Sequence, residues 1–361
     1  MQNIVSLTVN NQIYAGWKSV RIEAGVERVA RSFELSVTMR WPGNVDFDNR
    51  IKPGAAAEIR IDEDLVCTGY VDATPINYDA DQVSIIIRGR SKTADLVDCS
   101  ADAGAGQFRG LQLESIAAKL AGQYGVSVVT QVATGAPLTD HQTQQGESVF
   151  ESLDRLAKLR QVLITDDESG NLVIASTGSA GDATSGLALG VNILTGSAGF
   201  DYAEVYTSYQ VKGQKAGTDD SFGAASSQLL GTAADSTLTR QRVLIVRQSG
   251  QADAGSCLKR AQYEAQIRAA KAQEIRYRVA DWRQADGSLW RPNTMVQVDD
   301  AIMGVSAVML ISEVIYSLDE SGMVTDLTVI PPSAFQTYTE KQAKYTVKKG
   351  KNGKKVAAGW P

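Results

Sequence analysis

The chain has 361 residues, of which 43% are hydrophobic and 21% are charged, and its formal net charge is −5. This length suits two or three domains with a sizeable core, and the composition excludes a disordered chain. The chain has one histidine, His141, and three widely spaced cysteines, Cys67, Cys99 and Cys257. These numbers exclude a disulfide framework and a local zinc site, and they restrict any Ser-His or Cys-His mechanism to His141. We expect the cysteines to be small buried or free thiols in a reducing compartment.

The charge is divided unevenly along the chain. Seven of the 36 Lys and Arg residues lie in Lys341–Pro361, which holds no acid, so the preceding 340 residues carry the other 29 against all 41 Asp and Glu residues. An acidic body argues against a nucleic-acid-binding surface, because phosphate contacts need clustered basic residues. The basic segment is expected to be a mobile, solvated end, with binding to nucleic acid or to an acidic protein face as the alternatives.

The sequence carries no sign of export or membrane insertion. The opening segment MQNIVSLTVNNQIY lacks the basic and apolar regions of a secretory signal, and 18 consecutive apolar residues occur nowhere. We therefore expect a protein that is made and folded in a cytoplasm.

Residues 1–93 are predicted to form a first antiparallel β-barrel-like domain. The strongest signal is Ser32–Trp41, in which apolar and polar residues alternate throughout. Shorter alternations at 5–9, 59–61 and 83–87 are separated by turn residues, and they predict further strands of a barrel or sandwich.

Residues 94–190 are predicted to form a small α+β domain. Apolar residues from Leu113 to Leu120 share one helix face, and Gly125 is placed to end that helix. Ser148 and Glu151 fit a capping box, so a second helix is expected to begin there, with Phe150, Leu153, Leu156 and Ala157 on its apolar face. Two short apolar runs within 161–175 flank a turn at 167–170, which indicates a hairpin.

Residues 191–211 and 274–335 are predicted to form a second β-barrel-like domain, and 212–273 a loop and helix insertion. The stretch 212–235 is rich in Gly, Ala and Ser and predicts a mobile loop or arm, and 242–247 predicts a short strand. The helix expected over 254–273 presents Leu258, Ala261, Ala265, Arg268 and Ala272 at helical spacing. Strands are expected at 275–279, 295–298, 307–316 and 324–330, before a basic tail at 336–361.

The two β-domains show signs of an internal duplication. In both, an Arg precedes a Pro-Gly or Pro-Asn turn, and a strand ending in Asp leads into a hairpin with an acidic turn. The spacing slips by two residues, so convergence on common turn chemistry explains the likeness equally well.

Candidate reactive groups are few. The glycines of 104–110 are spaced wrongly for a dinucleotide loop, and His141 lies in the polar stretch TDHQTQQGES, which predicts a solvated loop histidine. The Asp pairs at 166–167, 219–220 and 299–300 lack a calcium-loop pattern, so turn chemistry and solvation explain them. Trp41, Trp282, Trp290 and Trp360 could stack on sugars, although Trp41 is expected in the core. No catalytic, cofactor-binding or metal-binding residue is predicted.

Residues 146–175, GESVFESLDRLAKLRQVLITDDESGNLVIA, carry a resemblance. The Gly-Glu-Ser start, Leu153, the Leu156-Ala157 pair, the apolar run at 162–164 and the turn at 170–172 resemble the middle domain of baseplate hub proteins of contractile-tailed bacteriophages. The whole chain is similar to the hub of Mu-like phages in its order of β-domain, small α+β domain, β-domain with a helical insertion, and basic tail.

The resemblance implies a structural protein of the virion rather than an enzyme. It implies a homotrimer whose six β-domains form a pseudo-sixfold ring between a trimeric central spike and a hexameric tail tube, with other baseplate proteins as neighbours. DNA would pass through the ring without specific binding, and assembly would take place in the host cell cytoplasm. The tail lysines are the expected protein-binding residues: Lys348, Lys349, Lys351, Lys354 and Lys355.

Three other functions stay open from the sequence. One is a tail-associated hydrolase that opens the cell wall, which would release peptidoglycan fragments. Another is a carbohydrate- or receptor-binding β-protein, which would show glycan binding in a cleft lined by Trp or Tyr. The third is the related hub of a contractile secretion apparatus, which would share the fold and differ in its biological setting.

Overall fold

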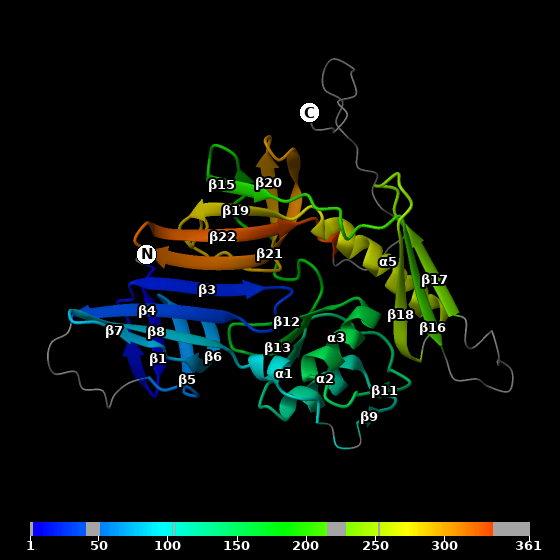
Figure 1. Ribbon diagram of the computed structural model, residues 1–361, viewed down its shortest axis with the longest axis horizontal. Helices are drawn as coiled ribbons and strands as arrows, with labels where there is room; N and C mark the ends of the chain where they lie inside the picture. Colours follow the sequence, from blue (N-terminus) through cyan, green and yellow to red (C-terminus); the bar gives the residue numbers. More distant parts are fainter. Residues whose placement is uncertain are drawn as a thin grey trace, which may run out of the picture.

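A computed structural model describes residues 3–40, 51–102, 104, 106–214, 229–251 and 253–334 (Figure 1). Strands make up most of its regular structure, and the α-helices of the described residues lie in a middle region and an insertion, so the predicted mainly β, α+β class is confirmed. The domain boundaries given above remain a proposed division.

The first region forms an antiparallel set of strands with alternating burial. In β1, for example, Val5, Leu7 and Val9 are buried, as the alternation predicts. The strand order is β3-β4-β8-β6-β5-β1-β2, with β7 paired to β8. The strands are β1 (Val5–Val9), β2 (Gln12–Tyr14), β3 (Ser19–Gly25), β4 (Ser32–Arg40), β5 (Ala56–Ile61), β6 (Asp64–Ala73), β7 (Ile76–Tyr78) and β8 (Gln82–Ser91).

The middle region contains short helices and a small three-stranded sheet. The capping box is confirmed: Ser148 Oγ accepts from the Glu151 amide, and the Glu151 carboxylate accepts from the Ser148 amide. The predicted hairpin is confirmed as β12 and β13, which place Ile164 opposite Ile174. The elements are α1 (Ala94–Asp98), β9 (Gln107–Phe108), α2 (Leu113–Gly122), β10 (Val128–Thr130), β11 (His141–Gln142), α3 (Val149–Arg160), β12 (Leu163–Asp166) and β13 (Leu172–Ala175).

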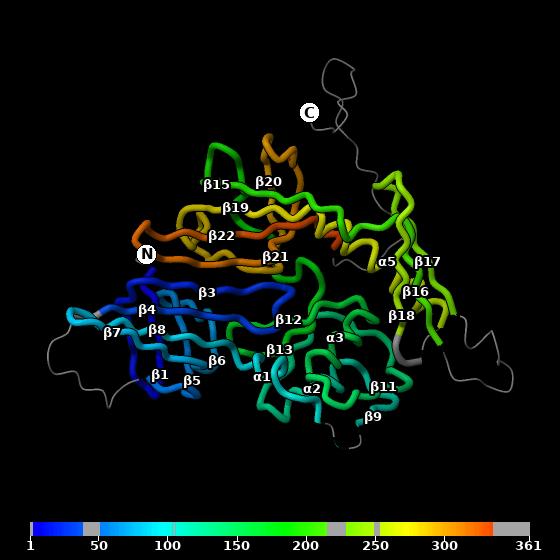
Figure 2. Tube along the Cα trace, viewed as in Figure 1, coloured from blue at the N-terminus to red at the C-terminus, as the bar shows by residue number. Residues whose placement is uncertain are grey.

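The last region forms a second β-unit, interrupted by an insertion that stands at one side of the molecule (Figures 1 and 2). The β-unit comprises β14 (Leu187–Ala188), β15 (Ile193–Ala198), β19 (Ile275–Ala280), β20 (Met295–Asp300), β21 (Val305–Asp319), β22 (Gly322–Ile330) and the short helix η1 (Pro332–Ala334). The insertion comprises β16 (Ser208–Gln214), β17 (Leu229–Ala234), β18 (Val243–Gln251) and α5 (Ala254–Lys271).

The insertion departs from the sequence prediction in three respects. Residues 229–234, expected in a loop, form β17; residues 208–211, expected in the second β-domain, belong to β16, which pairs with β17 and β18. Leu258 of α5, expected on the packed face, is 41% exposed, whereas Ala261 is buried as expected, together with Cys257 and Glu264. The cause is that Gly231 of β17 lies against the backbone of α5 at Cys257, which fixes the buried face one residue away from Leu258.

The two β-units are not separate closed barrels, because they merge into one sheet. β3 pairs antiparallel with the second half of β21, from Gly25 opposite Glu313 to Val20 opposite Leu318. Backbone pairing therefore runs unbroken from β15 to β2, in the order β15-β19-β22-β21-β3-β4-β8-β6-β5-β1-β2. One hydrophobic core also spans both units, from Leu7 and Ile59 in the first to Trp282 and Leu327 in the second.

The topology supports the internal duplication. The first unit has the strand order β3-β4-β8-β6-β5-β1 and the second β15-β19-β22-β21-β20-β14, and corresponding strands follow one another in the same sequence along the chain. The four pairings from β3 to β5, and the four from β15 to β20, are all antiparallel. The sixth strand differs, because β1 is antiparallel to β5 and β14 is parallel to β20.

A β-bulge recurs at the same place in both units. In the first hairpin the register shifts between Val71 and Ala73, and in the second between Ile311 and Glu313. From the bulge to the turn, each residue pair of the first hairpin corresponds to a pair of the second whose residue numbers are higher by 240. At the turn, for example, Tyr78 pairs with Val83 and Leu318 pairs with Met323. A shared bulge is a specific feature of a fold, so common turn chemistry alone does not account for the likeness.

A buried arginine ties the two units together at one end. Arg283, in the loop after β19, reaches the β5–β6 turn, where its guanidinium lies 2.7 Å from Asp64 Oδ2 and 3.2 Å from Asp62 Oδ2 and donates to Asn3 Oδ1 at 2.9 Å. Its side chain is 7% exposed. The pKa of Asp62 is lowered although partial burial acts to raise it, because the Ile4 and Asn3 amides and Arg283 favour its charged form.

We predict that Arg283→Ala lowers the free energy of unfolding by about 3 kcal/mol, because it leaves two carboxylates without their buried partner. Urea denaturation of the two proteins at pH 7 measures the difference. Arg278→Ala is the matched control, since Arg278 pairs with Asp326 across β19 and β22 but is 47% exposed, and we expect it to lose less than about 1 kcal/mol. Equal losses in the two variants would contradict the role assigned to Arg283.

Candidate functional site

The histidine is buried, which corrects the prediction of a solvated loop. His141 sits in β11, paired with Phe108 of β9, and only 7% of it is exposed. Its Nε2 forms a 2.8 Å hydrogen bond with Oγ of Ser152 on α3. Burial, with a smaller contribution from Arg155, lowers the pKa of His141 to about 4. The polar sequence around His141 concealed this, because the other residues of the stretch are exposed or partly exposed while His141 and Glu147 are buried.

The Ser152–His141 pair resembles part of a catalytic triad but is closed to substrate. Ser152 is fully buried, so no reacting group could approach its hydroxyl. Glu147, near the histidine, is engaged by the Arg155 guanidinium and by the Gln144 amide. The pair therefore links β11 to α3 through one buried hydrogen bond, which satisfies a polar atom on each side chain.

The predicted Asp pairs have different surroundings. Asp166 is not a solvated turn residue as expected: its side chain is 1% exposed and lies 3.1 Å from Arg31 Nε, joining the middle region to the first β-unit. Asp167 and Asp300 do cap turns, accepting from the amides of Asn171 and Ile302. The pair at 219–220 lies outside the described residues. Across the described part of the chain, no group of three or more His, Cys, Asp or Glu is placed to hold a metal ion.

The other candidate groups are also enclosed in the structure. Cys67 and Cys257 are buried and Cys99 is partly buried, all three as free thiols, and burial raises the pKa of Cys67 to about 12. Trp282 and Trp290 are buried in the shared core and are not available to stack on sugars, whereas Trp41 and Trp360 lie outside the described residues. Gly104, Gly106 and Gly110 have positive φ values, as flexible turns allow.

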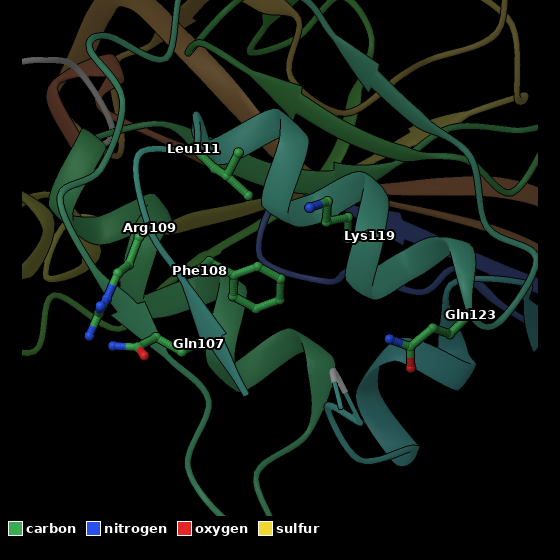
Figure 3. A pocket seen from close by; sticks show the side chains of 6 residues that line it. All are labelled: Gln107, Phe108, Arg109, Leu111, Lys119 and Gln123. Atoms are coloured by element: carbon green, nitrogen blue, oxygen red, sulfur yellow. The ribbon is translucent and has the colours of Figure 1, made fainter. Parts of the chain in front are cut away.

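Several hollows lie in and beside the middle region, one of them lined in part by His141. Figure 3 shows another, of about 420 Å³, where Lys119 and Gln123 lie across from the Phe108 ring and the Arg109 guanidinium points away from it. Its polar groups do not converge, so they offer no cofactor site. A third, of about 820 Å³, is an open groove between α3 and α5. Arg260 and Glu264 on its α5 side are paired with each other, and the partly buried Tyr263 also lines it.

Some of the exposed apolar residues lie on edge strands. Ile76 and Tyr78 lie on β7, where Tyr78 is 79% exposed, and Leu194 lies on β15, which pairs only with β19. Such edges present unpaired backbone groups to another chain. The sequence analysis did not single them out, although Ile76 and Tyr78 continue the alternation of the preceding strand beyond Pro75. A further exposed set, including Leu230 and Ile245, lies on the sheet of the insertion.

The structure bears differently on two further expectations. The five tail lysines lie outside the described residues. No helix within the described ranges is both long and apolar enough to cross a membrane. The described residues offer surfaces for function: a continuous sheet with edge strands that include β2, β7 and β15, and an insertion that carries exposed apolar residues.

Three family models match successive parts of the chain. Residues 4–91 match the Mu phage baseplate assembly protein GpP-like N-terminal domain. Residues 93–176 match the second domain of baseplate hub protein gp44-like proteins, and residues 254–338 match the fourth domain of Mu phage baseplate assembly protein GpP.

Similar proteins cover nearly the whole chain. Baseplate hub protein gp44 of Escherichia phage Mu is 33% identical over 353 residues, which are 95% of this chain and 92% of that protein. The 43 kDa tail protein of prophage MuSo2 from Shewanella oneidensis is 33% identical, with a TM-score of 0.82 over 93% of this chain and all of that one.

More distant structures share the fold. A tail protein from Neisseria meningitidis MC58 has a TM-score of 0.80 at 20% identity, covering 92% of this chain and 97% of that one. The E. coli c3393 protein, a component of the type VI secretion system, has a TM-score of 0.56 at 13% identity, covering 92% and 78%. The sequence-based resemblance is thus confirmed.

We predict that His141 makes stability depend on pH. Its pKa is lowered on folding, so its contribution is fully present above the unfolded value near 6.5 and is lost as the pH falls from there toward 4. Between pH 7 and pH 5 the wild type should lose about 1 to 2 kcal/mol more than His141→Gln, which does not titrate there. Thermal unfolding of both proteins across this range measures the difference, and identical pH profiles would contradict a buried neutral histidine.

Proposed function

Because the chain belongs to the family of baseplate hub proteins that includes gp44 of Escherichia phage Mu, we propose that three copies of it form a ring in the tail baseplate. The observation that carries this proposal is the duplication: each chain supplies two β-units with the same strand order, so three chains supply six. Such a ring is threefold in its chains and nearly sixfold in its β-units, and it could join a trimeric spike to a hexameric tail tube.

The ring is proposed to act mechanically, in a virion assembled in the host cell cytoplasm. The relatives are named as hub and tail proteins, and the Ser152 hydroxyl is fully buried, which supports a function without catalysis. Release of peptidoglycan fragments by the purified protein would contradict this and favour a cell-wall hydrolase. The excess of acidic residues before Lys341 supports passage of DNA without binding, since like charges repel. A strongly basic ring interior would contradict it.

The mass of the protein in solution tests the ring. We predict a particle near three times 38.6 kDa in light scattering at high protein concentration, because exposed strand edges at both ends of one sheet favour association. Dilution should shift the mass toward that of a single chain without passing through larger species, as expected of a closed ring. A particle that stays at 38.6 kDa, or that grows without limit, would contradict the proposal.

The basic tail is proposed to hold an acidic face of a neighbouring baseplate protein, with Lys348, Lys349, Lys351, Lys354 and Lys355 as its contacts. We predict that replacing these five lysines by Gln weakens binding to the spike or tube protein of the same phage at least tenfold at low salt. Replacing them by Arg keeps the charge and should keep the affinity. The affinities of both variants are measured by their binding to surface-immobilised spike and tube proteins. Unchanged binding by the Gln variant would contradict the proposal, and the solution mass should be the same for both variants.

A further inference from the structure

We infer from the duplication that β7 of one copy pairs, antiparallel, with β15 of a second copy. This inference rests on the proposed ring and names the surfaces that close it. Within one chain, the two β-units are already joined by one strand pairing, that of β3 with β21. The strands that correspond to β3 and β21 in the other unit are not paired with each other within one chain. An equivalent pairing between them would therefore need a second chain.

The corresponding strands follow from the strand order. β15 occupies the place of β3, because each is the outermost strand beside β19 or β4. The segment 64–78, which includes β6 and β7, occupies the place of β21. Segment 64–78 follows β5 and β21 follows β20, each leads to an acidic turn, and each has the bulge in the same position. β21 uses its second half to pair with β3, and β7 is the matching half of the first unit.

The transfer also fixes the register. Val20 of β3 lies opposite Leu35 of β4, and Gly196 of β15 lies opposite Tyr277 of β19. Leu35 and Tyr277 correspond, because their partners Ile87 and Leu327 differ by 240 in number. Gly196 therefore corresponds to Val20. Because Val20 lies opposite Leu318, Gly196 of one copy should lie opposite Tyr78 of the other. Asn77 then faces Ser197, and Ile76 faces Ala198.

The backbone of the β7 edge is free to form these bonds. Pro75, which lacks an N–H, directs its carbonyl to the Ile86 amide of β8 at 3.0 Å. In an antiparallel strand the N–H and C=O of one residue point to the same side, so the missing N–H of Pro75 faces β8. The N–H groups of its neighbours Thr74 and Ile76 face the open edge. The proline thus removes no hydrogen bond from the proposed pairing.

The side chains on the two edges fit one another. Tyr78 is 79% exposed, and the residue opposite it would be Gly196, which has no side chain to meet the Tyr78 ring. The Tyr277 ring lies alongside Gly196, within 3.1 Å of where a Cβ would stand, so Tyr78 would pack against that ring. Ile76 would cover Ala198, as Tyr316 covers Ile22 at the joint within the chain.

The geometry of the joint explains why it would build a ring. β7 and β15 are different surfaces, so the contact is heterologous and each copy keeps one free partner edge until the ring closes. The joint within each chain and the joint between chains would then have the same strand pairing. Alternating these two joints places six β-units around one axis, which is the arrangement that the proposed function requires.

A cysteine pair in the proposed register tests the inference. Asn77 and Ser197 correspond to Ser317 and Arg21, a pair in which the strands exchange no hydrogen bond and the Cα atoms lie closest, about 4.5 Å apart. That distance suits a disulfide. In a Cys99→Ser background, oxidation of Asn77→Cys/Ser197→Cys should give covalent dimers and trimers on a denaturing gel. Mixing the two single-cysteine proteins should give dimers that contain one chain of each.

Two control pairs complete the design. Arg21→Cys/Ser317→Cys has the same geometry within one chain and should oxidise without forming covalent oligomers. Ile13→Cys/Ser197→Cys places the first thiol on β2, at the other end of the sheet from β15. Ile13 is 74% exposed, so the thiol would be accessible, but this pair should give no covalent oligomer. If the protein is trimeric in solution and the Asn77/Ser197 pair forms no more oligomer than the Ile13/Ser197 pair, the register inference is wrong and the ring stands. A protein that is monomeric throughout contradicts both.

Tyr78→Asp gives an independent test that involves no thiol. A carboxylate at the proposed joint would be buried without a partner, so the dimers and trimers should dissociate at protein concentrations at least tenfold higher than for the wild type. Ile13→Asp, at a similarly exposed position away from the joint, should leave the dissociation unchanged. Equal effects from the two substitutions, measured by light scattering on a dilution series, would overturn the inference.

Discussion

The antiparallel pairing of β3 with β21 is the constraint on which the rest of the molecule depends. It joins strands that are almost 300 residues apart in sequence, and it converts two similar β-units into one sheet with a common core. A backbone ladder allows little rotation between its two sides, so the units keep a fixed angle. Arg283, which bridges to Asp62 and Asp64 away from the ladder, adds a second point of attachment. Two attachments far apart prevent a hinge that either alone would permit.

The parts inserted between the strands are held to this sheet by different means. The middle region joins it through the buried contact of Asp166 with Arg31, and through a small apolar cluster in which Val26, Leu163, Ala270 and Leu310 meet. The insertion occupies the place that a short turn takes between β3 and β4. Its own sheet packs against α5 in a core of four buried residues, with no share in the large core. Function can therefore vary in the insertion without disturbing the pairing of the strands.

The sequence predicted those features that depend on local patterns. Alternation located β4 and β21, and the Ser148–Glu151 box located the start of α3, since each is set by neighbours a few residues away. Features decided by distant contacts were missed or mistaken. β17 is a strand because it pairs with β16, although its composition suits a loop; His141 is buried because α3 supplies Ser152 from another segment. The assembly edge on β7 was missed for a related reason, since an exposed pair of apolar residues gains meaning only when the second unit shows what its counterpart does.

The differences between the two units explain why the proposed ring would be threefold and not sixfold. β21 runs unbroken from Val305 to Asp319, whereas the matching segment is interrupted at Thr74-Pro75 and divided into β6 and β7. The joint within the chain thus has a continuous strand on one side, and the joint between chains has a shorter one. Gly196 stands where β3 has Val20, so the joint between chains accommodates the larger Tyr78 in place of Leu318. A joint with fewer backbone contacts and a larger exposed side chain is suited to open and close during assembly, while the covalently linked joint keeps each pair of units intact.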